Sequence, residues 1–325
     1  MQLAVLDDYQ RIALASADWE RLRRRGVGIT VFHDAFATLD EAAEKLTAFE
    51  IVCLMRERTP LPRALVERLP RLRFVTFTGT RSPSLDDAAC AARGIAVSCT
   101  RPGNGTVSTA ELAWGLIIAA ARDLAQAERG MRAGRWHEGL APGFMLEGRR
   151  LGLLGLGRMG SRMARIGHAI GMEVVAWSQN LTPDAAAAGN AAWVPKNELL
   201  ESCDVVSIHL VLSERTRGLM GAAELARMKP TAILVNVSRG PIVDETALIR
   251  ALRAGRPGHA ALDVYEREPL PAEHPLRSLP NVTLSPHLGY ANAENYRAFY
   301  GDIVENVEAW LDGHPVRLLA GRGMG

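Results

Sequence analysis

The chain has 325 residues, which is enough for two domains of ordinary size. Its 38 basic and 36 acidic side chains leave a formal net charge of +2, which argues against a dedicated nucleic-acid-binding protein. Hydrophobic residues make up 48% and charged residues 23%, a composition typical of folded soluble proteins and unlike that of disordered chains.

The four cysteines carry no metal or disulfide signature. Cys53, Cys90, Cys99 and Cys203 form no C-x-x-C pair and lie beside no histidine at a zinc spacing, so we expect reduced thiols and no metal site. The N-terminus, MQLAVLDDYQ, does not resemble a targeting signal, and the most apolar segment, 112–121, is too short to span a bilayer. We therefore expect a cytoplasmic protein.

The first hundred residues alternate between short apolar runs and helical patterns. The runs that predict strands lie at 3–7, 29–33, 51–55, 72–78 and 95–99. Segments that predict helices, several of them opened by Asp, Ser or Pro, include 40–48, 63–69 and 84–93. This alternation is typical of a parallel sheet.

A long apolar helix separates this region from a second series of strands. The helix is predicted from Thr106 to about Ala127, and because it is apolar nearly all round we expect it to pack on two sides. After a polar passage at 129–150, strands are predicted at 150–155, 173–177, 204–210, 231–237, 259–264 and 281–285. This is the pattern of a doubly wound sheet. A final helix at 292–311 has no strand left to cover in the second series, so we expect it to cross back to the first domain.

Three glycines mark a dinucleotide turn. Gly155, Gly157 and Gly160 form G-x-G-x-x-G directly after a predicted strand and directly before a helical pattern that Arg158 and Met159 open. In such folds the first glycine makes the turn, the second lets the backbone approach a pyrophosphate, and the third lets helix and strand pack closely. An ordinary glycine-rich turn is the alternative, and the order strand, loop, helix, strand disfavours it.

The next predicted strand ends in WSQN, where NAD-binding folds usually carry Asp or Glu for the adenosine ribose. Ser178 occupies that place. Serine can bond to a ribose hydroxyl but does not repel a 2′-phosphate, and no adjacent arginine attracts one. The residues here leave the choice between NAD and NADP open.

Three later strands end in VNVSRGPIVD, ALDVYEREPLP and LSPHLG, at the sheet edge where ligands of open α/β sheets bind. These segments carry Arg239, Asp263, Glu268 and His287. Hydride transfer to a ketone requires a proton donor and a cation that holds the substrate, and this set supplies both.

On these residues the sequence resembles the D-isomer-specific 2-hydroxyacid dehydrogenase family over nearly its whole length, with GLLGLGRMG, HLVLSERTRGLM, MKPTAILVNVSRGPIVDETAL, ALDVYEREPLP and SPHLG in order. The resemblance implies an α/β protein with two Rossmann-like domains. A flavodoxin-like substrate domain would comprise residues 1–101 and 288–325, and an NAD(P)-binding doubly wound domain residues 102–287. It also implies a homodimer paired through the helix near 106–127 and the arm at 129–148.

The resemblance further implies the reaction and its residues. The protein would interconvert a 2-oxo acid and a D-2-hydroxy acid with a nicotinamide cofactor, as glyoxylate/hydroxypyruvate reductases and phosphoglycerate dehydrogenases do. Arg239 would bind substrate, His287 would donate and accept the proton, and Glu268 would pair with it. With the glycine turn, the implied cofactor residues are Gly155, Gly157, Arg158, Met159, Gly160, Ser178, His209, Val237, Asp263 and Gly289. Asp263 and the backbone at Val237 resemble positions that hold the nicotinamide carboxamide.

Two positions depart from the family pattern. Val211 stands where proline is usual, which we expect to change loop stiffness only, and Ser178 replaces the usual Asp. The remaining histidines lack a partner motif and are expected to be structural or surface residues: His33, His137, His168, His259, His274 and His314.

In the first domain, TGTR resembles the family loop whose backbone N–H groups hold the substrate carboxylate, which implicates Gly79, Thr80 and Arg81. Arg56, in MRERTP, follows a neighbouring strand. For both arginines a substrate-binding role and a solvated surface position are equally consistent with the sequence.

Two alternatives differ in function. A regulatory protein that senses NAD, like the corepressors of this family, has the same fold, and turnover with NADH would separate the two. The second alternative is formate oxidation within the same superfamily. That reaction needs no proton donor, and the resembling enzymes have glutamine where this chain has Glu268, which disfavours this alternative.

Overall fold

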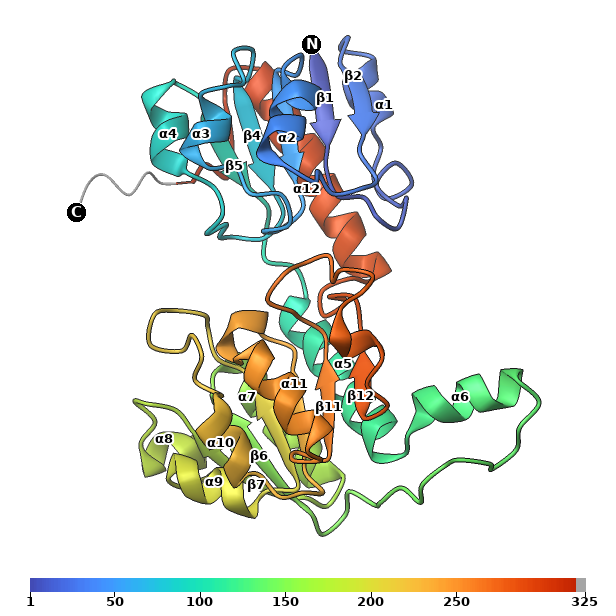
Figure 1. Cartoon of the computed structure of the whole chain (residues 1–325). Coiled ribbons are helices and arrows are strands. Elements are labelled where there is room, and N and C mark those ends of the chain that lie inside the picture. Colours follow the sequence, from blue (N-terminus) through green and yellow to red (C-terminus); the bar gives the residue numbers. More distant parts are fainter. Residues whose placement is uncertain (320–325) are drawn as a thin grey trace. The chain divides into compact units, whose positions relative to one another are not determined.

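The computed structural model describes residues 1–319 and divides the chain into two compact units (Figure 1). Of the described residues, the first unit contains 1–104 and 292–319, and the second contains 105–291. Each unit is built on a parallel sheet with helices, which confirms the predicted α/β class.

The first unit holds a five-stranded sheet in the order β2-β1-β3-β4-β5, with every neighbouring pair parallel. This is the flavodoxin-like strand order. Its elements are β1 (Gln2–Val5), α1 (Glu20–Arg23), β2 (Gly28–Val31), α2 (Leu39–Leu46), β3 (Ile51–Leu54), α3 (Arg63–Val66), β4 (Phe74–Phe77), α4 (Asp87–Ala92), β5 (Ala96–Cys99) and α12 (Ala293–Leu311). All five strands lie where the apolar runs predicted them.

The final helix, α12, packs on this first sheet. Asn292 caps it by accepting a hydrogen bond from the Asn295 backbone N–H. Trp310 stacks on Phe74 of β4 with ring centroids 5.1 Å apart, and the Asn306 amide donates to Thr76 of the same strand at 3.0 Å. The helix therefore completes the unit that begins at the N-terminus.

The second unit holds a seven-stranded parallel sheet in the order β12-β11-β10-β9-β6-β7-β8. The order reverses between β6 and β9, as in a doubly wound dinucleotide-binding fold. Its strands are β6 (Arg150–Leu154), β7 (Glu173–Trp177), β8 (Ala192–Trp193), β9 (Val205–Ile208), β10 (Ile233–Asn236), β11 (His259–Leu262) and β12 (Val282–Leu284). Its helices are α5 (Gly105–Ala121), α6 (Leu124–Arg132), α7 (Arg158–Ala169), α8 (Pro183–Ala188), α9 (Lys196–Ser202), α10 (Ala222–Arg227), α11 (Glu245–Arg253) and the short 3-10 turns η1 (Gly240–Ile242) and η2 (Pro275–Arg277).

The single long helix predicted at 106–127 is wrong, because the structure divides it into α5 and α6. Asp123 adopts a left-handed backbone conformation with φ +48°, which an α-helix cannot continue through. The segment after α6 also comes back to the last residue of α5, where the Phe144 N–H donates to the Ala121 carbonyl oxygen at 3.0 Å. The predicted polar passage from residue 129 accordingly begins inside α6.

The described residues form no helix long and apolar enough to cross a membrane. The four cysteines are free thiols, and three of them are buried. Burial raises the pKa of Cys90 to about 11, so this thiol stays protonated near neutral pH.

Candidate active site

The three glycines form the predicted turn between β6 and α7, at the point where the strand order of the second sheet reverses. Gly155 has φ +99°, and a side-chain carbon there would lie 2.6 Å from the His209 carbonyl oxygen. A carbon at Gly160 would lie 2.2 Å from the Gly155 oxygen, whereas one at Gly157 would meet nothing within 4 Å. The chain itself thus fills the space at the first and third glycines and leaves the second open to a ligand.

The start of α7 supplies donors to that open space. The helix begins at Arg158, with Met159 next, and the first amides of a helix have no partner inside it. Such amides favour an anion. The turn therefore fits a dinucleotide pyrophosphate.

His209 follows β9 beside this turn. Its Nε2 lies 2.9 Å from Ser207 Oγ, while Nδ1 is buried with no hydrogen-bond partner in residues 1–319. Burial lowers the pKa of His209 to about 4, so the imidazole is neutral near pH 7. Ser178 follows β7 and is partly exposed. Because this residue is a serine, the end of β7 carries an uncharged side chain at this position.

Arg239 leaves the carboxyl end of β10 through a turn held by Asn236. The Asn236 side chain accepts from the Ser238 N–H and donates to the Arg239 carbonyl oxygen, each at 3.0 Å. Ser238 Oγ in turn donates to the Leu210 carbonyl oxygen at 2.8 Å. Val237 is buried inside this turn. The backbone that carries the guanidinium is therefore well fixed.

Glu268 and His287 form a direct pair, with Oε2 and Nδ1 2.5 Å apart. The other carboxylate oxygen accepts the Tyr265 N–H at 3.0 Å. Burial opposes ionisation of Glu268, but the hydrogen bond and charge of His287, with a smaller contribution from Arg239, hold its pKa below the ordinary value. The carboxylate is therefore ionised near neutral pH and can stabilise an imidazolium. His287 has φ +55°, a strained backbone conformation of the kind found at functional sites.

Asp263 holds the loop that carries His287. One of its oxygens accepts from Ser285 Oγ at 2.6 Å and from the Leu288 N–H at 2.7 Å, and the other accepts from the Gly289 N–H at 2.9 Å. Burial raises the pKa of Asp263 despite these hydrogen bonds. Its contact with a cofactor stays a prediction, while the partners of its three hydrogen bonds all lie in the loop that carries His287.

In the first unit, Arg56 and Gly79 lie together at the carboxyl ends of β3 and β4. Gly79 has φ +90°, and a side-chain carbon there would lie 2.0 Å from an Arg56 guanidinium nitrogen. The Gly79 N–H donates to Thr100 Oγ1 at 2.8 Å, so the predicted carboxylate loop would have to use the amides of Thr80 and Arg81. The Arg81 side chain is exposed.

Two residues of the site escaped the sequence analysis. Tyr265 donates its hydroxyl to the Ser285 carbonyl oxygen at 2.8 Å and joins the loops of Glu268 and His287. Ser207 contacts His209. Residues two positions apart in a strand share a face, so this spacing could have predicted the contact. Tyr265 stands inside a recognised motif, but nothing local indicates where its hydroxyl points.

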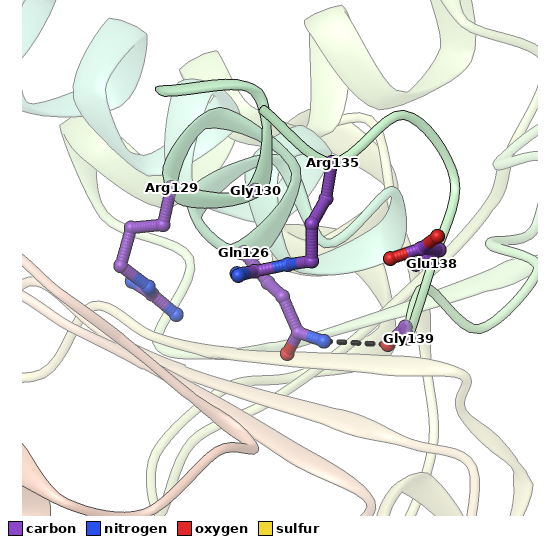
Figure 2. Close-up of a pocket in the computed structure, with 6 residues that line it drawn as sticks. All are labelled: Gln126, Arg129, Gly130, Arg135, Glu138 and Gly139. Atoms are coloured by element: carbon purple, nitrogen blue, oxygen red, sulfur yellow. Dashed lines mark hydrogen bonds between the residues drawn. The ribbon is translucent and has the colours of Figure 1, made fainter. Parts of the chain in front are cut away.

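A separate pocket lies between α6 and the segment that follows it (Figure 2). It is lined by Gln126, Arg129, Gly130, Arg135, Glu138 and Gly139. The Gln126 amide closes one side by donating to the Gly139 carbonyl oxygen at 2.6 Å. No predicted catalytic or cofactor residue lines this pocket.

The geometry of the second unit defines a class of enzyme. A glycine turn at the switch point of a doubly wound sheet, in the same unit as an imidazole paired with an ionised carboxylate, suits a dehydrogenase that exchanges a proton as hydride moves. Residues 114–289 match the family model described as "D-isomer specific 2-hydroxyacid dehydrogenase, NAD binding domain". The chain belongs to the D-isomer specific 2-hydroxyacid dehydrogenase family, as its motifs predicted.

Known proteins resemble the chain over most of its length. It is 42% identical over 257 residues to a glyoxylate reductase of Aeropyrum pernix, covering 77% of this chain and 76% of that enzyme. It is 30% identical to a hydroxypyruvate reductase of Blautia hydrogenotrophica, covering 98% and 99%. The crystal structure of a phosphoglycerate oxidoreductase from Vibrio cholerae superposes with a TM-score of 0.90 at 37% identity, covering 96% and 99%. The chain is an NAD(P)-dependent D-2-hydroxyacid dehydrogenase, and these findings confirm the predicted reaction and cofactor class.

Proposed function

We propose that the enzyme reduces short 2-oxo acids of the glyoxylate and hydroxypyruvate type, with Arg239, Glu268 and His287 as its catalytic residues. The observation that carries the proposal is the 2.5 Å contact of Glu268 with His287, because it prepares an imidazole to act as an acid. The names of the Aeropyrum and Blautia relatives support the choice of substrate.

Each residue has one task in the proposed reduction. The Arg239 guanidinium binds the substrate carboxylate and carbonyl oxygen with planar donors. A nicotinamide cofactor, when bound, would supply the hydride that the carbonyl carbon accepts. His287, held through Nδ1 by Glu268, donates the Nε2 proton to the carbonyl oxygen, which becomes the hydroxyl of the product. In the oxidative direction the same nitrogen accepts that proton.

The other site residues keep their predicted roles in this proposal. The glycine turn with Arg158 and Met159 would bind the pyrophosphate, Ser178 the ribose, and Val237, Asp263 and Gly289 the nicotinamide end. In the first unit, the amides of Thr80 and Arg81 and the Arg56 guanidinium would bind the anionic substrate.

A panel of 2-oxo acids assayed with NADH and with NADPH tests the proposal. Glyoxylate and hydroxypyruvate should give the highest kcat/KM, and 3-phosphohydroxypyruvate and pyruvate serve as comparison substrates. Highest kcat/KM with 3-phosphohydroxypyruvate would refute the substrate assignment. Binding of NADH without turnover of any acid would instead favour the regulatory alternative.

Ser178 is expected to allow NADH while discriminating only weakly against NADPH, because it offers a hydroxyl contact and no charge. Ser178→Asp should sharpen the preference for NADH by repelling the 2′-phosphate, and Ser178→Arg should move it toward NADPH. The ratio of kcat/KM for the two cofactors measures both effects. A wild-type enzyme that strongly prefers NADPH would contradict this prediction and point to a cation elsewhere, such as Arg158.

We also propose that the enzyme is a homodimer paired through α5 and the arm after it. Figure 1 shows α6 reaching away from the other elements of the second unit. Met131, Trp136 and Met145 on this arm are 53%, 72% and 77% exposed, which is unusual for large apolar side chains that have no partner to cover them.

Sedimentation at micromolar concentration should therefore show a dimer. Met131→Asp should shift the equilibrium toward the monomer, because it would place a charge in the apolar interface. Leu14→Asp, at a residue that is 48% exposed in the first unit, is the matched control and should leave the dimer intact. A monomeric wild type would refute the proposed interface.

A further inference from the structure

We propose that Glu245 and His274 are positioning residues for the reduction, acting together to place the Glu268 carboxylate against His287. The inference rests on the proposed function, since it concerns the same site. Neither residue touches the His287 imidazole. They act on the backbone turn that carries Glu268.

Glu245 begins α11 and connects that helix to the Glu268 turn. Its Oε2 accepts the Glu266 N–H at 3.2 Å, and its Oε1 lies 3.0 Å from His274 Nε2. The side chains of Glu245 and His274 are only 15% and 17% exposed, so water competes weakly for these contacts. One carboxylate thus ties a rigid helix to the residue two positions before Glu268.

The hydrogen bonds around His274 indicate how its ring is oriented. The Leu276 N–H points at Nδ1 at 3.4 Å, which makes Nδ1 the acceptor and leaves the proton on Nε2 to be donated to Glu245. The segment after Glu268 is held separately, because the Arg277 guanidinium donates to the carbonyl oxygens of Leu270 and Pro271. Loss of Glu245 would loosen the end near Glu268 and leave the other end held.

The Glu268 turn also contacts the turn that follows Arg239. A side-chain carbon at Gly240 would lie 2.0 Å from the Tyr265 carbonyl carbon and oxygen and 2.5 Å from the Glu266 nitrogen. The backbone at Glu266 is thus held between Glu245 and the turn at Gly240. A shift there changes the position of Glu268, since Glu268 accepts the Tyr265 N–H within the same turn.

The expected result of Glu245→Ala is a fall in kcat of about 10- to 100-fold, because displacement of a catalytic group by about 1 Å can cost that much. KM should change by less than about threefold, since the Arg239 guanidinium that binds substrate is retained. Glu245→Gln should restore most of kcat, because its amide oxygen can still accept the Glu266 N–H. His274→Ala should lower kcat in the same direction but less, since it leaves that hydrogen bond in place.

Glu224→Ala is the matched control. Glu224 has the same kind of contacts on α10, with one oxygen 2.9 Å from Lys196 Nζ and the other accepting the Gly221 N–H at 3.2 Å. It should lower Tm about as much as Glu245→Ala without lowering kcat. If both variants lower Tm and neither lowers kcat, Glu245 is only structural and the inference is wrong.

A double-mutant cycle tests the route through Glu268. In a Glu268→Gln background, Glu245→Ala should have little further effect on kcat, because the group it positions is already lost. Fully additive losses would overturn the proposed route. Failure of the proposed function looks different, because the wild-type enzyme would then turn over none of the 2-oxo acids.

Discussion

Replacing His287 with alanine will lower kcat for 2-oxo acid reduction by about 10²–10⁴-fold, the usual contribution of a positioned general acid. The imidazole is held by Glu268 at 2.5 Å, and its loop is fixed by Asp263, so the substitution removes a proton donor whose position is set by the fold. The glycine turn is untouched by the substitution. A fluorescence titration should therefore give a Kd for NADH close to that of the wild type.

His168→Ala provides the control for the loss of an imidazole. His168 belongs to the same unit, at the end of α7, and its Nε2 lies 2.9 Å from the Asn190 carbonyl oxygen. This variant should keep a wild-type kcat. Near-normal turnover by His287→Ala would refute the assignment of the proton donor.

Replacing Arg239 with glutamine should lower kcat/KM by about 10²–10³-fold, comparable to the loss of a donor that stabilises a developing oxyanion. The guanidinium is the proposed contact for both the carboxylate and the carbonyl oxygen of the substrate, and it also contributes to the low pKa of Glu268. Arg239→Lys keeps the charge but loses the planar pair of donors. It should therefore recover only part of the activity.

The measurement is steady-state kinetics with glyoxylate or hydroxypyruvate for both variants. Arg250→Gln, at an exposed position on α11, removes the same charge from the same unit and should leave the kinetics unchanged. If Arg239→Gln loses no more activity than Arg250→Gln, the substrate contact must lie elsewhere.

Most of the fold follows from local sequence patterns. The apolar runs of β3 and β4 are buried on both faces, and such continuous runs between helical segments are characteristic of parallel sheets. The division between α5 and α6 was not predictable, because it depends on the Phe144 N–H from a distant segment and on the left-handed conformation of Asp123. The edge strand β8 has only two residues and gives no periodic signal.

The site was partly predictable for a similar reason. Arg239, Glu268 and His287 stand in motifs at strand ends, and the parallel sheet brings those ends to one edge. The contacts of Glu245 and His274 depend on the path of the loop between β11 and β12, which the sequence does not indicate. His274 was therefore expected to be a structural or surface residue. The observed contacts of Asp263 also depend on that path, since two of them are to the backbone of the His287 loop.

The packing of α12 on β4 affects the order in which the protein can fold during synthesis. The second unit is one continuous stretch, residues 105–291, and can complete its contacts once that stretch has left the ribosome. The first unit starts earlier but must wait for Trp310 and Asn306 to cover Phe74 and Thr76. Domains usually fold in the order in which they are made. Here the unit at the N-terminus is expected to finish last, with Phe74 and Thr76 of its sheet uncovered until translation reaches α12.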